Sequence, residues 1–352
     1  MKLFTPVSFR DIQLKNRIMV SPMCEYSAHD GHPTNWHMVH LGSRAVGGAG
    51  LVFTEATAVS TIGRISPADT GIYLDAHVDS WRPIVEFIRE QGAVPGIQLA
   101  HAGRKASTGI PWLGGAPISV EGGGWIPVAP SAIPFSTGYT VPHELKNAAI
   151  NQIESDFVAA ARRALQAGFQ VVELHAAHGY LLHEFLSPLS NQRSDDFGGR
   201  FENRIRLLLC VAARVREVWP AELPLFVRIS ASDWVENGWD LAQSTELARR
   251  LKGIGVDLID VSSGGLVATA KIPFGPGYQV KFAEAIRREA GIATGAVGMI
   301  TDAVQAETIL SSGQADVVIL ARELLRDPYW PRRAASELGV KIKPPVQYER
   351  AW

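Results

Sequence analysis

The strongest constraint on the fold is a regular alternation of short apolar runs with helical patterns, from about residue 18 almost to the C-terminus. The apolar runs carry few polar residues, as expected of parallel strands covered on both faces. The eight strand candidates are Ile18 to Pro22, Gly50 to Ala56, Val94 to Ala100, Phe169 to His175, Leu225 to Ser230, Leu258 to Ser262, Thr294 to Val297 and Val317 to Leu320. The helical segments are Trp36 to Val46, Val78 to Gln91, Gln152 to Ala167, Phe201 to Val218, Leu241 to Gly253, Lys281 to Ala290, Ala303 to Ser312 and Tyr329 to Leu338.

Eight strand-helix units with right-handed crossovers predict a (β/α)8 TIM barrel rather than a doubly wound open sheet. Neither a linker nor an internal repeat divides the chain, so we expect residues 1–352 to form a single barrel domain. Such barrels need about 250 residues. The surplus accommodates a Gly- and Pro-rich insertion at about 109–142 and a C-terminal tail at 339–352.

Composition narrows the class of protein. With 46% hydrophobic and 20% charged residues, the chain is able to bury a full core. A formal net charge of -1, without blocks of like charge, disfavours nucleic-acid and membrane-surface partners. Cys24 and Cys210 are the only cysteines, which excludes a disulfide framework. No apolar run resembles a signal peptide or a membrane span, so we expect a cytoplasmic protein.

The fourth strand candidate runs into His175, His178 and Tyr180. Imidazoles donate hydrogen bonds to an oxygen that gains negative charge, and a phenol delivers a proton. These residues therefore predict a site that stabilises an oxyanion beside a proton donor. The i, i+3 histidine spacing, with His183 and Glu184 close downstream, also suits a metal site. A metal-dependent TIM-barrel hydrolase that uses His175 and His178 is thus the alternative.

Other strand ends supply further polar side chains. Arg228 and Gln98 lie in apolar strands, where their buried donors need polar or anionic partners, and both suit the edge of a planar heterocycle. The remaining candidates at strand ends are Ser21, Pro22, Met23, Cys24, Tyr26 and Ala58. All of these side chains are expected to face one central pocket, because the carboxyl ends of barrel strands meet at one face.

The last two strands carry a different signal. Gly298 follows the seventh strand, and Ala321 and Arg322 follow the eighth, where a helix begins. Free backbone amides, a helix N-terminus and a guanidinium together predict a monophosphate-binding site. We therefore expect a phosphorylated cofactor or substrate to lie across the barrel mouth.

The chain resembles the old yellow enzyme family of FMN-dependent ene-reductases, and within it the xenobiotic-reductase-like bacterial subgroup. The resemblance runs essentially end to end. The stretches that carry it are Ser21-Pro22-Met23-Cys24, His101-Ala102-Gly103-Arg104-Lys105, His175-Ala176-Ala177-His178-Gly179-Tyr180, and Ser190-Asn191-Gln192-Arg193 with Phe197-Gly198-Gly199.

The resemblance implies tightly but non-covalently bound FMN, with NADPH or NADH as reductant. Its isoalloxazine would be contacted by Ser21, Pro22, Met23, Cys24, Ala58, Gln98 and Arg228, and its phosphate by Gly298, Ala321 and Arg322. The family usually has glycine where this chain has Ala321. Cys24 is implied to tune the flavin potential, and Arg228 to stabilise the anionic reduced flavin.

The implied reaction moves a hydride from nicotinamide to flavin N5 and then to the β-carbon of an α,β-unsaturated carbonyl compound such as an enone, enal or maleimide. His175 and His178, with Tyr26, would polarise the carbonyl, and Tyr180 would protonate the α-carbon. The resemblance also implies a homodimer or homotetramer in which Arg350 of the tail reaches the neighbouring active site.

Overall fold

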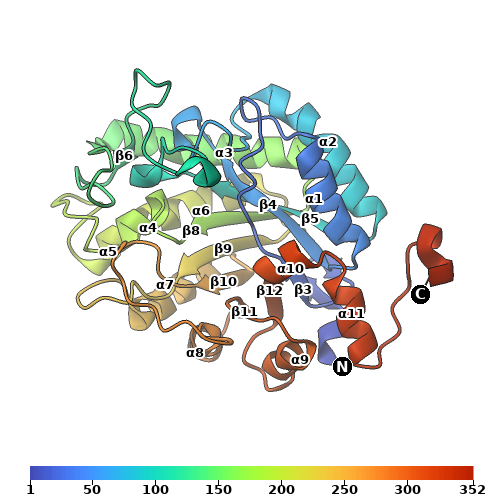
Figure 1. Ribbon diagram of the computed structural model, residues 1–352. Helices are drawn as coiled ribbons and strands as arrows, with labels where there is room; N and C mark the ends of the chain where they lie inside the picture. The colour runs from blue at the N-terminus through green and yellow to red at the C-terminus, as the bar shows by residue number, and fades with distance from the viewer. Residues whose placement is uncertain (352) are drawn as a thin grey trace.

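A computed structural model describes residues 1–351 and shows a closed barrel of eight strands, all paired in parallel (Figure 1). Around the barrel the strands follow the order β10-β11-β12-β3-β4-β5-β8-β9. Their bounds are β3 Ile18–Val20, β4 Leu51–Ala58, β5 Val94–Ala100, β8 Val171–Ala176, β9 Leu225–Ser230, β10 Leu258–Ser262, β11 Ala293–Ala296 and β12 Val317–Leu320. The predicted TIM barrel is confirmed, and each strand candidate overlaps one barrel strand.

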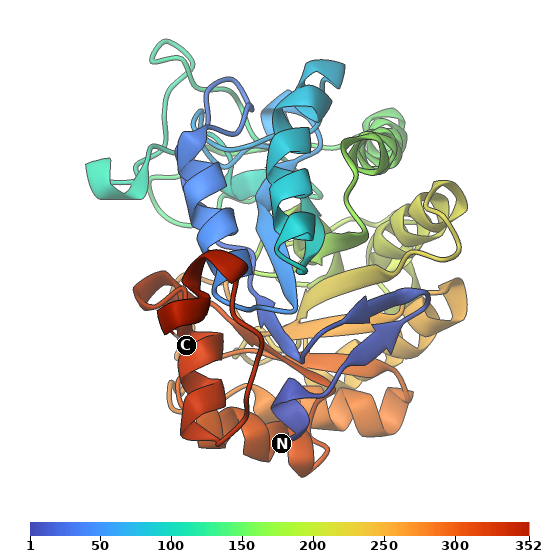
Figure 2. The ribbon, with the colours of Figure 1, turned by 90° about the vertical axis from the view of Figure 1, so that its right-hand side faces the viewer.

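An N-terminal hairpin that the sequence patterns did not predict plugs one end of the barrel. Strands β1 (Val7–Phe9) and β2 (Ile12–Leu14) pair in antiparallel fashion, and Figure 2 shows them lying across the barrel. Phe9, Ile12 and Leu14 join an apolar cluster with side chains of the barrel interior, and the Phe9 and Phe226 ring centres lie 5.1 Å apart. Because this end is filled, the open mouth lies at the carboxyl ends of the strands.

Helices surround the barrel and bury their apolar faces against the outer side of the strands (Figure 1). They are α1 Asn35–Val46, α2 Asp75–Glu90, α3 Asn147–Ala167, α6 Arg206–Val218, α7 Leu241–Ile254, α8 Val280–Ala290, α9 Ala303–Ser311 and α11 Trp330–Glu337. Three short helices, α4 Leu181–Leu186, α5 Phe201–Arg204 and α10 Arg322–Arg326, complete the set. The helix predicted from Phe201 to Val218 is thus interrupted at Ile205.

The long segment between β5 and α3 is mostly irregular and contains the two-residue strands β6 (Val128–Ala129) and β7 (His143–Glu144). It begins at the carboxyl end of β5, and Lys105 near its start donates a hydrogen bond to the backbone after β8. It therefore borders the barrel mouth. None of the helices within residues 1–351 is both long and apolar enough to cross a membrane.

Candidate active site

The floor of the mouth is a set of inward-facing polar side chains on neighbouring strands. Arg228 on β9 donates a hydrogen bond to Ser21 Oγ, 3.0 Å away, and its Nε lies 3.2 Å from Asp260 Oδ2 on β10. Gln98 Nε2 on β5 donates to Glu173 Oε1 on β8 at 2.8 Å. The fold thus brings the predicted residues Ser21, Gln98 and Arg228 into one buried layer and adds two carboxylates that sequence reasoning did not select.

The loop after β3 places Cys24 and Tyr26 beside this floor. One oxygen of Glu55 accepts the backbone N–H of Glu25 at 3.1 Å, and the other lies 2.8 Å from His37 Nε2. Tyr26 adopts a left-handed backbone conformation, with φ of 47°, a strained geometry that surrounding contacts must maintain. Burial, and then nearby carboxylates, raise the pKa of the Cys24 thiol well above its usual range, so the thiol stays protonated.

The turn after β8 gathers His175, His178 and Tyr180. The His175 ring centre lies 5.2 Å from that of His178 and 5.1 Å from that of Tyr180. Burial, and then the charge of Arg228, lower the pKa of both imidazoles, which therefore remain neutral. Burial raises the pKa of the Tyr180 phenol, which keeps its proton. Neutral N–H donors thus lie beside a protonated phenol.

Several contacts hold this turn in an unusual backbone conformation. His178 has φ of 59°; its N–H donates to Ser230 Oγ at 2.9 Å, and its Nε2 lies 2.7 Å from Ser262 Oγ. The next N–H, of Gly179, donates to Nδ1 of buried His183, whose Nε2 lies 3.0 Å from Asp233. Hydrogen bonds with Ser230, Ser262 and His183 therefore fix the backbone of the turn and the position of the His178 ring.

Lys105 also borders the site, although the sequence marks it only as part of a family motif. Its Nζ donates to the backbone oxygens of His178, at 2.9 Å, and Gly265, at 3.2 Å. It also lies 4.9 Å from the centre of the Tyr180 ring. Burial lowers the pKa of Lys105 to about 8. Arg104 and Lys105 follow the end of β5 within five residues, and this pair of cations was the signal available in the sequence.

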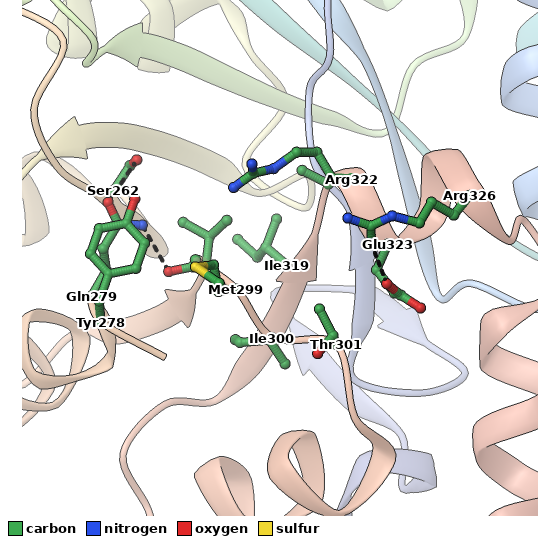
Figure 3. A pocket seen from close by; sticks show the side chains of 13 residues that line it. Ser262, Tyr278, Gln279, Met299, Ile300, Thr301, Ile319, Arg322, Glu323 and Arg326 are labelled. Atoms are coloured by element: carbon green, nitrogen blue, oxygen red, sulfur yellow. Dashed lines mark hydrogen bonds and ion pairs between the residues drawn. The ribbon is translucent and has the colours of Figure 1, made fainter. Parts of the chain in front are cut away.

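A cavity of about 210 Å³ lies beside the carboxyl ends of β11 and β12 (Figure 3). Gly298, Ala321 and Arg322, the three residues predicted to hold a phosphate, all line it. Figure 3 shows Arg322 reaching across the cavity towards Ser262 and Tyr278. The Arg322 side chain has no hydrogen bond or ion pair within residues 1–351, so its guanidinium charge is available to a bound anion (Figure 3).

Gly298 is suited to its place by both space and conformation. Its φ is 119°, and a Cβ there would come within 2.7 Å of Gln279 Nε2. Ala321, where the family usually has glycine, has φ of -107° and ψ of -97°, a combination outside the main α and β regions.

The remaining predicted residues lie at two strand ends and in the C-terminal tail. Pro22 and Met23 follow β3, and Ala58 ends β4 opposite Ala100. Arg350 lies in a short 3-10 helix, Val346–Ala351. Val346 and Gln347 at its start border residues 90–92 just before β5, at the filled end of the barrel. This chain's own fold therefore does not bring the tail carrying Arg350 to the site.

The hydrolase alternative is not supported. No group of three or more His, Cys, Asp or Glu side chains within residues 1–351 is arranged to hold a metal ion. His183 is engaged with Gly179 and Asp233 instead. The site thus defines a barrel enzyme that holds a phosphorylated heterocycle. FMN fits it, because Gly298 leaves room beside the unpaired Arg322, and His175 Nδ1 is buried without a hydrogen-bond partner among the described residues.

Comparison with known proteins gives the family. Residues 2–340 match the model of the NADH:flavin oxidoreductase / NADH oxidase family. An NADPH dehydrogenase of Geobacillus sp. (strain WCH70) is 54% identical over 99% of this chain and 98% of its own length. The NADPH dehydrogenase of Bacillus subtilis (strain 168) is 51% identical over 100% and 99%.

Solved structures agree. An old yellow enzyme homologue from Zymomonas mobilis has a TM-score of 0.80 at 30% identity, covering 99% of this chain and 96% of its own. Morphinone reductase in complex with tetrahydroNAD has a TM-score of 0.81 at 28% identity, with 99% and 94% covered. The chain belongs to the NADH:flavin oxidoreductase / NADH oxidase family and is of the old yellow enzyme type. It is an oxidoreductase that uses FMN with NADPH or NADH.

Proposed function

We propose that this enzyme reduces the activated C=C bond of α,β-unsaturated carbonyl compounds, such as enones, enals and maleimides. The observation that carries the proposal is the cluster of His175, His178 and Tyr180, in which two neutral imidazoles lie beside a protonated phenol. Such a cluster is able to bind a carbonyl oxygen and to supply a proton two atoms away.

The cofactor would be held at both of its ends. Ser21, Gln98 and Arg228, with the backbone around Pro22, Met23, Cys24 and Ala58, would contact the isoalloxazine, and Gly298, Ala321 and Arg322 the phosphate. Bound non-covalently in this way, FMN supplies the two-electron exchange between the reduced nicotinamide and the C=C bond. Arg228 offers positive charge where the reduced cofactor becomes anionic.

His175 and His178 act on the substrate carbonyl. Because burial and Arg228 keep both rings neutral, each offers an N–H donor without the cost of burying a full positive charge. Tyr26 would assist; support comes from its packing, with Cys24 and Tyr180, against the same small cluster of buried apolar residues. These donors stabilise the negative charge that builds on the oxygen as electrons enter the β-carbon.

Tyr180 is the proton donor to the α-carbon. Its raised pKa keeps it protonated in the resting enzyme, and the Lys105 ammonium 4.9 Å from its ring stabilises the phenolate that forms. The names of the curated relatives favour NADPH as reductant. The complex of morphinone reductase with tetrahydroNAD supports the use of a nicotinamide nucleotide as reductant.

We further propose a cytoplasmic homodimer or homotetramer built from single barrel domains of 1–352, with the insertion at 109–142 shaping the substrate pocket. The tail at 339–352 would contact a neighbouring subunit and carry Arg350 to that subunit's site. Support comes from the position of the tail away from this chain's own mouth.

Tyr180→Phe tests the central role. It should slow reoxidation of the reduced enzyme by an enone by about a hundredfold or more, the range for loss of a general acid. Flavin reduction by NADPH, followed in the same stopped-flow instrument, should stay nearly unchanged. An equal loss in both half-reactions would remove Tyr180 from this role.

A further inference from the structure

Two fully buried carboxylates belong to the floor of the site and have no part in the mechanism described above. Glu173 on β8 and Asp260 on β10 each expose 0% of their surface. Glu173 accepts a hydrogen bond from Gln98 at 2.8 Å, and Asp260 lies 3.2 Å from Arg228 Nε. Gln98 and Arg228, two of the polar side chains that would face the flavin ring, are therefore each backed by one carboxylate.

The charges of this layer do not balance if both carboxylates are ionised. The charged or titratable groups that face the pair are Arg228 on β9 and, next to it in the sheet, the neutral ring of His175 on β8. Gln98 on β5 adds only a neutral amide. A single guanidinium thus serves two buried carboxylates, and an uncompensated buried charge is costly.

Proton binding relieves this imbalance. Burial, followed by the charge of Asp260, raises the pKa of Glu173 well above its usual range, and burial also raises that of Asp260. One oxygen of Glu173 and both oxygens of Asp260 lack a hydrogen-bond partner among the described residues. Two carboxylates near one charge bind protons as a coupled pair, so the first proton is shared between them.

The pair also fixes the orientation of Gln98. Because Gln98 Nε2 donates to Glu173, its carbonyl oxygen is left to accept a hydrogen bond from the other side. The pyrimidine edge of a flavin presents an N–H donor between two carbonyl oxygens. An ionised Glu173 therefore presents the acceptor end of Gln98 to that edge, and a protonated Glu173 is able to reverse the amide.

We propose that Glu173 and Asp260 are positioning residues for Gln98 and Arg228 that share one proton in the oxidised enzyme and bind a second proton from solvent when the flavin is reduced. This inference rests on the proposed function. The electrons come from the nicotinamide, and the extra proton forms an O–H bond on the pair without breaking a bond of the cofactor. Its uptake follows because reduction places negative charge beside Arg228, which then stabilises the carboxylates less.

The test is the reduction potential of the bound FMN as a function of pH. A two-electron couple that takes up one proton changes by about 30 mV per pH unit. With the pair contributing, the wild-type slope should approach twice that value between about pH 6 and pH 8. Glu173→Gln and Asp260→Asn should return the slope to about 30 mV. Glu154→Gln, which removes a carboxylate from the outer helix α3, is the matched control and should keep the wild-type slope.

Infrared difference spectra identify where the proton goes. Reduced minus oxidised wild-type enzyme should show a new carboxylic-acid C=O band that shifts in D2O and disappears in Glu173→Gln or Asp260→Asn. A wild-type slope of about 30 mV per pH unit or the lack of this band would overturn the proposal, and so would a steep slope retained in both variants. Failure of an enone to reoxidise the reduced flavin would instead overturn the proposed function, so the two failures are distinguishable.

Discussion

Gly298→Ala tests the proposed phosphate-binding cavity by adding a single methyl group. The new Cβ would lie 2.7 Å from Gln279 Nε2 and 2.9 Å from Tyr278 Cε1. Gln279 is not free to move away, because it donates to the Val297 carbonyl at 2.8 Å and accepts from Ser263 at 2.5 Å. Breaking one such bond costs about 1 kcal/mol, and alanine at φ of 119° adds about 1 to 3 kcal/mol of strain.

The free energy of unfolding of the apoprotein should therefore fall by about 2 to 4 kcal/mol, measured by urea denaturation. FMN should bind at least about tenfold more weakly, measured by the recovery of flavin fluorescence on dilution. Gly253→Ala is the control, because it lies in helix α7 with no atom within 4 Å of the added Cβ. Its FMN affinity should equal that of the wild type. If Gly298→Ala changed neither the free energy of unfolding nor the FMN affinity, the assignment of this cavity as a closely fitting phosphate-binding site would be refuted.

Three further changes test other parts of the site. Lys105→Met should slow enone reduction about tenfold to a hundredfold while FMN affinity stays constant. Because the Lys105 ammonium is lost as pH rises through about 8, wild-type activity should decline above that pH. The variant should not show this decline. His183→Ala should raise KM for the enone, since the Gly179 N–H loses its hydrogen-bond acceptor, and His183→Asn should restore much of the lost enone affinity. Equal KM values in the wild type and both variants would show that His183 does not position the turn. Removal of the residues after Val346 should weaken both subunit assembly and enone binding, as followed by light scattering and KM, and a fully assembled, equally active truncation would contradict the shared-site proposal.

The barrel could be predicted because each strand is a short apolar run in the sequence. The glycines and polar residues of the site come within or directly after these runs. The same rule located Arg228, Gln98 and the residues around Gly298, which the structure brings to one mouth. The N-terminal hairpin escaped prediction because its strands are only three residues long, below the length at which periodicity is informative.

The supporting residues could not be found from sequence, because their roles depend on contacts between distant segments. Glu173 and Asp260 look like interruptions of apolar strands until the register places them beside Gln98 and Arg228. Lys105 lies 73 residues before His178, whose backbone it holds. Such long-range pairs are set by closure of the barrel and leave no periodic signal.

The central claim is that electrons stored in this enzyme pass to an activated C=C bond. Enzyme reduced by NADPH without oxygen should regain its oxidised flavin absorbance when mixed with cyclohex-2-enone, and each enzyme-bound flavin should yield one molecule of cyclohexanone. A flavin that stays reduced in the presence of enones, enals and maleimides, and is reoxidised only when oxygen is admitted, would contradict the account.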